Sequence, residues 1–332
     1  MNTGKTPIRT FPRTKRETPE GAVGQTAHTA RARRTYSLFR TLSALLLSAA
    51  VALALGGCGK GDSKDAGTKV PAATPAPHAG ANGGGQVVTL ALVPSADLLP
   101  LYYAERAGCF RKLGAVVRIE TYRSQLDCDT ALLGGRTDGG SADITRMEQC
   151  HKRAFAAFAP VWMSEAAWCP AVCGTLRVKN TAALKGRMVA ISRQSADNAA
   201  LSRALSQAKM KAESVYRPQI NDLALRARML DNGQVDAAML RWPYTSAAVS
   251  AGHRLLPPAP SSGTTDALVL RTERLRKDGG KRLPALLRRG YNMAVDSLRH
   301  PRREVLLEVL CRDYGLAPEV ADTIKLPSLR KK

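Results

Sequence analysis

Short apolar runs alternate with helical segments through most of the chain after residue 86. The runs at 87–93 and 115–122 have the length of buried strands, and helices are expected at 101–105 and 128–133. Further strand-like runs lie at 155–159, 161–164 and 171–178. Strands that alternate with helices predict βαβ units and a parallel sheet, and therefore an α/β fold.

A second block with the same alternation begins after Leu184-Lys185-Gly186. Its expected strands and helices lie at 187–192, 196–208, 215–219, 223–230 and 236–240. The two blocks echo each other, because Ser95-Ala96-Asp97 and Ser195-Ala196-Asp197 each follow the first strand of a block. The segments 132–138 and 230–236 match at nearly the same offset, so we expect two lobes of like topology.

The last part of the chain is expected to return to the first lobe. A segment rich in Pro, Ser and Gly at 257–263 precedes a strand at 267–270, and amphipathic helices with a basic outer face follow. These helices are expected at 281–298 and 303–314. Lobe 1 is therefore assigned to 86–176 and 264–332 and lobe 2 to 177–263. Two crossings, near 174–179 and 261–266, are expected to form the hinge.

An apolar run of about 14 residues, Leu42 to Leu55, follows a basic stretch near the N-terminus. It is too short to span a membrane and well sized for the core of a signal peptide. Leu55-Gly56-Gly57-Cys58 resembles a bacterial lipobox, which implies lipid attachment to the Cys58 thiol and cleavage before it. The alternative is an anchor helix followed by a chance cysteine. Residues 1–57 are thus assigned to a lipoprotein signal peptide with an N-terminal extension, and 58–85 to a flexible tether.

The chain is strongly basic, with 50 Lys and Arg against 27 Asp and Glu and a formal charge of +23. Without the leader's nine basic and two acidic residues, the remaining 275 residues carry about +16. An exported lipoprotein rarely meets nucleic acid, and an aromatic content of 5% argues against a base-stacking surface. No nucleic-acid partner is expected. Affinity for an anionic membrane surface and simple compositional bias both remain as explanations.

Six cysteines remain beyond Cys58, and an oxidising compartment would allow them to form disulfides whose connectivity the sequence leaves open. Cys169 and Cys173 are the only close pair, so they are the candidate disulfide. Their spacing does not suit a thioredoxin-type or haem-attachment site. The histidines of the domain, at 151, 253 and 300, have no metal-ligand spacing. Neither a cofactor nor a metal is expected.

Several segments together resemble one known family, over about residues 86–315. They lie at 87–94, 104–110, 133–138, 184–191 and 232–238. Jointly they resemble the solute-binding proteins of nitrate/sulfonate/taurine-type ABC importers, a group that includes binders of thiamine-pyrimidine precursors. The resemblance implies a type 2 periplasmic binding protein with two lobes, a two-strand hinge and a cleft between the lobes. It further implies a lipid-anchored receptor at the extracytoplasmic face that passes a small solute to permease and ATPase subunits.

The expected site lies at the carboxyl ends of the strands, in loops at 94–97, 122–125, 140–143, 192–197 and 241–244. Ligands bind at this edge of open parallel sheets, and helix N-termini there suit anionic groups. The predicted ligand-binding residues are Pro94, Ser95, Arg123, Ser141, Arg193, Ser195, Arg241, Trp242 and Tyr244. Arginines could bind an anion through two hydrogen bonds, and the aromatic residues could stack on an apolar or heteroaromatic portion. Each has a simpler alternative: a helix cap for the serines, a solvated or salt-bridged side chain for any arginine, and hinge packing for Trp242.

Enzyme function is the main alternative, since the same fold is used by enzymes of pyrimidine and menaquinone precursor biosynthesis. The related eukaryotic pyrimidine synthase needs a dense cysteine motif, and this chain has none. It also has no G-x-S-x-G elbow and no phosphate-binding glycine loop. We therefore expect a protein that is not an enzyme and has no catalytic residues. A lipoprotein that keeps the fold, binds no ligand and acts through protein interactions is the third possibility.

Overall fold

Two β-sheets organise the computed structural model, which describes residues 87–164, 167–258, 263, 265–277 and 280–332. The predicted signal peptide, the lipobox with Cys58 and the tether lie outside these residues. No helix of the described residues is long and apolar enough to span a membrane.

The first sheet has five strands in the order β2-β1-β3-β9-β4. β1 pairs in parallel with β2 and β3, whereas β9 runs antiparallel between β3 and β4. The strand β9 comes from far along the chain, so the chain returns to the first sheet after it has formed the second. The bounds are β1 (Val87–Leu92), β2 (Val116–Thr121), β3 (Gly139–Asp143), β4 (Phe158–Ser164) and β9 (Asp266–Arg271).

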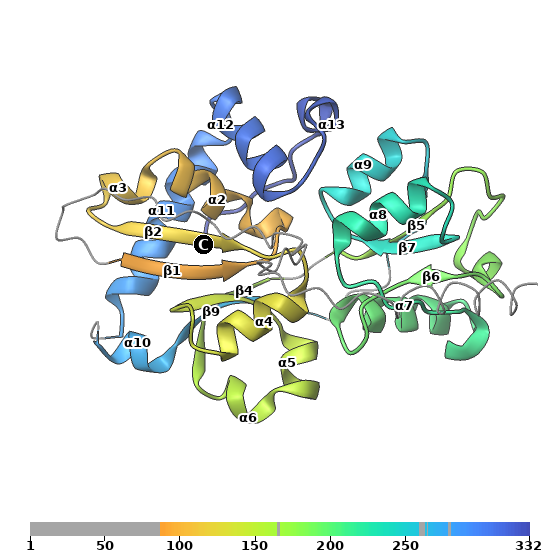
Figure 1. The fold of residues 1–332 in the computed structure, drawn as a ribbon, viewed down its shortest axis with the longest axis horizontal. Coiled ribbons are helices and arrows are strands. Elements are labelled where there is room, and N and C mark those ends of the chain that lie inside the picture. The colour runs from red at the N-terminus through yellow and green to blue at the C-terminus, as the bar shows by residue number, and fades with distance from the viewer. Residues whose placement is uncertain (1–86, 165–166, 259–262, 264, 278–279) are drawn as a thin grey trace, which may run out of the picture. The chain divides into compact units, whose positions relative to one another are not determined.

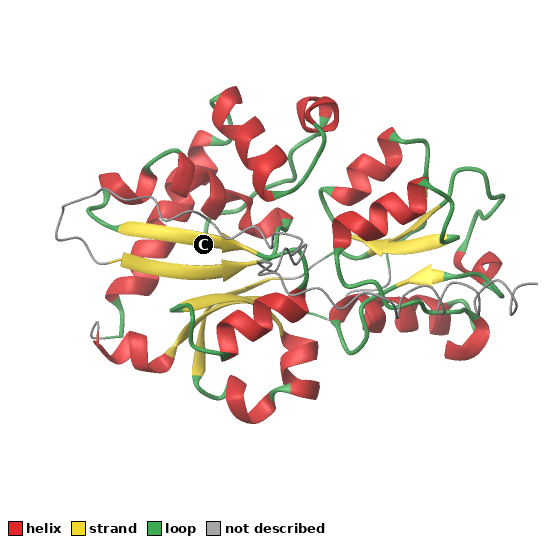
Figure 2. Cartoon of the chain, in the orientation of Figure 1, coloured by secondary structure: helices red, strands yellow, loops and turns green. Residues whose placement is uncertain are grey.

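Helices cover both faces of this sheet (Figures 1 and 2). On one face α2 packs against α11, whose buried stripe includes Leu287 and Tyr291. Gly290 of α11 has no room for a side chain because the ring of Phe110 lies against it. The helices of this lobe are η1 (Ala96–Leu98), α2 (Leu99–Arg106), α3 (Cys109–Lys112), α4 (Gln125–Leu133), α5 (Ile144–Cys150), α6 (Lys152–Phe155), α10 (Thr272–Lys277), α11 (Arg282–Ser297), α12 (Arg303–Glu308), the π-helix η4 (Val309–Asp313) and α13 (Pro318–Thr323).

The second sheet has four short strands in the order β6-β7-β5-β8. β6 and β7 are parallel, and β5 is antiparallel to both β7 and β8. In Figure 2 the helices again lie on both faces. The elements are β5 (Cys169–Val172), η2 (Thr181–Leu184), β6 (Val189–Ala190), α7 (Ala196–Gln207), η3 (Ala212–Ser214), α8 (Leu223–Asp231), β7 (Ala237–Leu240), α9 (Tyr244–Ser250) and β8 (Arg254–Leu255).

The chain first crosses between the sheets after β4 and before β5, earlier than the expected crossing at 174–179. β5 pairs with β7 and β8, so residues 169–176, which we had assigned to lobe 1, go with the second sheet. The apolar run that contains β5 suits a strand of either sheet, and only pairing with distant strands decides between them. The second crossing lies between β8 and β9.

Three expected strands differ from the observed elements. The run at 215–219 forms only isolated bridges, Met188 with Tyr216 and Ile191 with Gln219, and no strand. The runs at 155–159 and 161–164 become the end of α6 and one bulged strand, β4. The sequence did not predict β3, because it begins with Gly139-Gly140 and so lacks the apolar run of a buried strand. Glycine is required there because the carbonyl oxygens of Ala91 and Val269 leave no space for a Cβ.

The two echoed segments occupy equivalent positions in the two lobes. Ser95 precedes η1 after β1, and Ser195 precedes α7 after β6. In the same way α4 leads to β3, and α8 leads to β7. β1 lies between β2 and β3, as β6 lies between the bridged segment 216–219 and β7. Like topology of the two lobes is therefore confirmed.

Candidate functional site

A small cavity, lined mainly by polar and charged residues, lies between the two sheets at the ends of their central strands. The loops that line it follow β1, β2, β3, β6 and β7, which is the edge where open α/β sheets bind ligands. Its free volume is about 30 Å³, enough for one or two water molecules. The lining residues are Val93, Arg123, Gln125, Leu126, Asp143, Arg146, Trp168, Ser192, Ser195, Asp197, Asn221, Leu223, Arg241 and Asp266.

Arg241 and Trp168 form one wall of the cavity. The guanidinium carbon of Arg241 lies 4.9 Å from the centre of the Trp168 ring, and its Nη1 donates to Asp266 Oδ2 at 2.7 Å. Among the described residues, the buried Arg241 Nε and Trp168 Nε1 have no hydrogen-bond partner. Two N–H groups without acceptors beside a polar cavity favour a ligand that brings acceptor oxygens.

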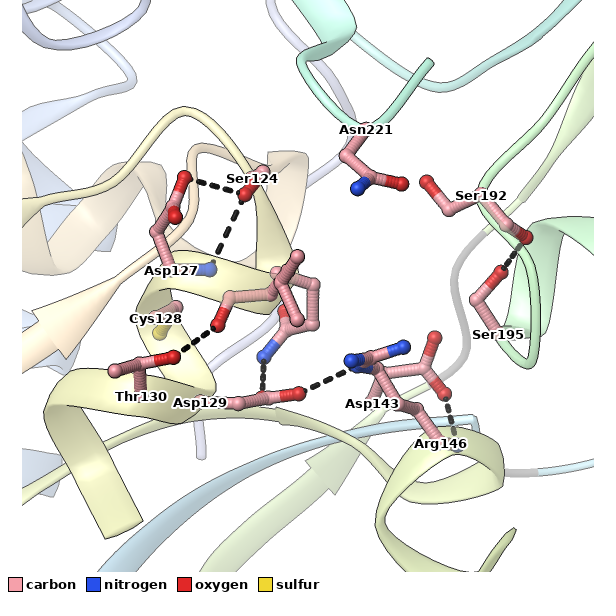
Figure 3. Close-up of polar contacts among 12 residues, drawn as sticks. Ser124, Asp127, Cys128, Asp129, Thr130, Asp143, Arg146, Ser192, Ser195 and Asn221 are labelled. Atoms are coloured by element: carbon pink, nitrogen blue, oxygen red, sulfur yellow. Dashed lines mark hydrogen bonds and ion pairs between the residues drawn. The ribbon is translucent and has the colours of Figure 1, made fainter. Parts of the chain in front are cut away.

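Helices α4 and α5 supply the opposite side of the cavity. Arg146 Nε donates to Asp129 Oδ2 at 2.6 Å, and Gln125 holds the same carboxylate through Oδ1 at 2.8 Å. In Figure 3, Asp129 and Arg146 lie opposite Ser192, Ser195 and Asn221 of the second lobe. Arg146 also reaches across, since its Nη1 lies 3.5 Å from the carbonyl oxygen of Arg193.

Asp143, the last residue of β3, connects the two lobes. Its Oδ1 accepts from Arg146 N at 3.0 Å and so caps α5, while its Oδ2 accepts from Ala196 N of α7 at 2.7 Å. The N-terminus of α7 therefore already holds a carboxylate from the other lobe. We had expected this terminus to be open for a solute.

Two carboxyl groups of the site, Asp143 and Asp266, have raised pKa values. Burial raises the pKa of Asp143 to about 7, and the nearby charge of Asp266 adds to the shift. Burial also raises the pKa of Asp266, which the positive charge of Arg241 opposes only in part. Raised acid pKa values in a cavity are typical of functional sites.

Three of the predicted ligand-binding residues line the cavity: Arg123, Ser195 and Arg241. Ser95 and Ser141 line a smaller adjoining pocket that also includes Arg241 and Asp266. Ser195 does not accept a capping bond; its hydroxyl donates to Ser192 O and Asp197 Oδ1.

The other predicted ligand-binding residues lie outside these two cavities. Pro94 is buried nearby, and Arg193 is exposed in a separate surface groove beside Tyr216. Trp242 donates from Nε1 to Lys325 O and packs edge-on against Tyr314, and Tyr244 donates to Tyr314 O. The alternative that Trp242 is a packing residue therefore describes this structure.

Trp168, Asp143 and Arg146 are site residues that the sequence interpretation missed. Trp168 lies in the first crossing, which we had placed too late in the chain. Asp143 lies in the expected loop at 140–143, where we had selected Ser141. An aspartate directly before a helix is the pattern of a helix cap, and this is the signal that could have found Asp143.

The candidate disulfide is not formed, because all six cysteines of the described domain are free thiols. Cys169 begins β5, and Cys173 continues the same pairing through its N–H to Asp236 O. Residues four apart in a strand have Cα atoms about 13 Å apart, whereas a disulfide needs less than about 7 Å. The described residues also contain no group of three or more His, Cys, Asp or Glu side chains arranged to hold a metal.

Several solved structures of binding proteins are similar to this one. The periplasmic aliphatic sulphonate-binding protein SsuA of Escherichia coli is 21% identical, with a TM-score of 0.57 over 71% of this chain and 81% of that chain. The alkanesulfonate-binding SsuA of Xanthomonas axonopodis pv. citri, bound to MOPS, is 20% identical, with a TM-score of 0.59 over 71% and 82%. This is the fold of periplasmic binding proteins. The predicted two-lobed α/β fold class is confirmed.

The periplasmic nitrate-binding protein NrtA of Synechocystis PCC 6803 is also similar. It is 13% identical, with a TM-score of 0.56 over 71% of this chain and 69% of that chain. By their names, all three neighbours are binding proteins of the kind the sequence resembles, and none is an enzyme. A scan against protein-family models and a search of curated proteins each found no match.

Proposed function

We propose that the protein is the lipid-anchored substrate-binding component of an ABC importer. It captures a small solute between its lobes and delivers it to permease and ATPase subunits. The observation that carries this proposal is the cavity between the sheets, where Arg241 and Trp168 hold buried N–H groups without acceptors. A lipid on Cys58 would keep the receptor at the extracytoplasmic face, beside the permease.

We further propose that the solute carries an anionic group with oxygen acceptors. A buried donor without a partner loses its water and gains nothing, and an oxyanion would satisfy both Arg241 Nε and Trp168 Nε1. Arg123 adds an exposed positive charge at the rim of the site. Sulfonate and nitrate, named for the neighbouring structures, are groups of this kind.

Solute entry requires the lobes to separate. The free volume of about 30 Å³ is far below the roughly 300–1,000 Å³ of pockets that hold small-molecule ligands, and the lining residues come from both lobes. Movement about the two crossings, after β4 and after β8, would open the cavity and leave each sheet intact. Closure around the solute would then bury it on both sides.

Native mass spectrometry of the purified full chain tests whether a small molecule remains bound. Titration calorimetry with ethanesulfonate, MOPS and nitrate then compares Trp168→Phe, which keeps a ring but removes the donor, with Arg193→Ala as the control outside the cavity. We expect about a tenfold loss of affinity for Trp168→Phe and none for Arg193→Ala. Equal affinity of wild type and Trp168→Phe, or no bound molecule and no binding of any probe, would contradict the proposal.

A further inference from the structure

We propose that Asp143 is an internal ligand of the site: its carboxylate occupies the N-terminus of α7 and competes there with the anionic group of the solute. The part that concerns the solute rests on the proposed function. The contact itself is a property of the fold, and it makes Asp143 a residue that sets the affinity of the receptor.

The contact joins two lobes through a single carboxylate. Asp143 ends β3 of the first sheet, and the Ala196 N–H that it accepts, at 2.7 Å, opens α7 beside the second sheet. The two residues are 53 positions apart, and both are nearly inaccessible to solvent. The N-terminus of a twelve-residue helix attracts negative charge, and Asp143, when its carboxyl group is ionised, supplies that charge from within the protein.

No cation neutralises Asp143 in the part of the chain that the structure describes. The three nearby arginines are paired with other carboxylates: Arg146 with Asp129, Arg241 with Asp266, and Arg226 with Asp197. Within the described residues, the side chain of Asp143 is held by two backbone N–H groups. A buried charge with so few partners can be displaced more easily than a member of an ion pair, because its removal leaves no opposite charge behind.

The remaining donors of the site indicate what would displace it. Asn198 N at the start of α7 is already bonded to Asp197 Oδ1, whereas Ala196 N–H, which Asp143 holds from the other lobe, is a donor that a solute could take over. Arg241 Nε and Trp168 Nε1 have no acceptor. A solute anion that enters between the lobes would replace Asp143 at Ala196 and provide acceptors for these two groups as well.

The test compares Asp143→Ser with wild type in the full chain. Serine can still cap α5, but its side chain is too short to reach Ala196, so folding is expected to persist. Glu148→Gln is the matched control, since it removes one negative charge from an exposed position on the same helix. Hydrogen exchange followed by mass spectrometry reports the Ala196 amide, and calorimetry with ethanesulfonate, MOPS and nitrate reports affinity at a pH above the pKa of about 7, where Asp143 is ionised.

We expect the Ala196 amide to exchange at least tenfold faster in Asp143→Ser, and the variant to bind the anions about tenfold more tightly. Glu148→Gln should match wild type in both measurements. Binding of an anion by the variant but not by wild type would also support the competition. Unchanged exchange at Ala196, or equal, weaker or absent anion binding by the variant, would overturn it. Equal anion binding by wild type and variant would contradict the competition but leave the proposed solute-binding function intact. Failure of the competition can therefore be told apart from failure of the proposed function.

Discussion

Arg226 and Asp197 form an ion pair in which both side chains are buried, with 2.6 Å between Arg226 Nη1 and Asp197 Oδ2. Arg226 also donates hydrogen bonds to the carbonyl oxygens of Met239 and Ile220 and to Ser192 Oγ. Asp197 in turn accepts from Ser192 N. The pair therefore holds the loop that lines the cavity in place against β7.

Removal of Arg226 should strongly destabilise the protein. Arg226→Met leaves Asp197 as a buried charge without a partner, and the expected loss is about 3–5 kcal/mol in the free energy of unfolding. Urea denaturation measures it. Arg303→Met, which breaks an exposed pair with Asp322, is the control and should change stability by less than about 1 kcal/mol. Similar losses in the two variants would show that the buried pair has no special role.

The raised pKa of Asp143 predicts a specific dependence of stability on pH. Between about pH 4 and pH 7 folded Asp143 holds a proton that the unfolded chain has lost, so stability falls as the pH rises through this range. The effect reaches a few kcal/mol at most. This pH dependence should be absent in Asp143→Asn. The quantity to measure is therefore the difference in the free energy of unfolding between wild type and Asp143→Asn as a function of pH. Glu105, whose pKa burial also raises to about 7, is present in both proteins and cancels. Parallel pH profiles would contradict the assignment.

Trp242 and Trp168 should respond differently to substitution. Trp242→Ala removes a packing contact with Tyr314 and a hydrogen bond to Lys325 O, and we expect a loss of about 2 kcal/mol in stability with nearly unchanged solute affinity. Trp168→Phe should lose solute affinity and keep nearly unchanged stability. Thermal denaturation and calorimetry on both variants measure the two effects. The sequence interpretation placed Trp242 among the ligand-binding residues. A large loss of solute affinity in Trp242→Ala would support that interpretation and contradict the present prediction.

The thiols of Cys169 and Cys173 should both react with an alkylating reagent in unreduced, denatured protein. In the native state Cys169 should react faster than Cys173, because it is partly exposed and Cys173 is buried. Burial raises the pKa of the Cys169 thiol, so both should react more slowly than in the denatured protein. The melting temperature should also be the same with and without a reductant, since no bond between them is broken. A peptide pair linked between these cysteines would contradict the prediction.

Lipidation at Cys58 stays a prediction from the leader and the lipobox-like pattern. Several acyl chains, at roughly 0.8 kcal/mol per buried CH₂, would anchor the protein almost permanently. Cys58→Ser should leave the chain unprocessed or release it from the membrane, as membrane fractionation and intact-mass analysis would show. A conservative change at Cys109, which lies within the folded domain, is the control for expression. Normal processing and fractionation of Cys58→Ser would exclude the anchor.

The order and type of most elements could be read from the sequence because they depend on local pattern. The apolar run of β1, the helical spacing of α11 and the equivalent starts of η1 and α7 are each set by neighbours along the chain. The edge of the sheets that carries the cavity also follows from topology alone. Arg241 was found in this way, since it directly follows a buried strand.

Tertiary structure alone decided which residues meet in the cavity. β5 joined the second sheet because it pairs with distant strands, and this placed Trp168 beside Arg241. The N-terminus of α7 was filled by Asp143, 53 residues away, although both the helix and the acid were visible in the sequence. Hydrophobic periodicity records whether a side chain is buried, but not which partner it is buried against. The partner depends on how strands far apart in the chain pair, and that is determined only when the whole domain folds.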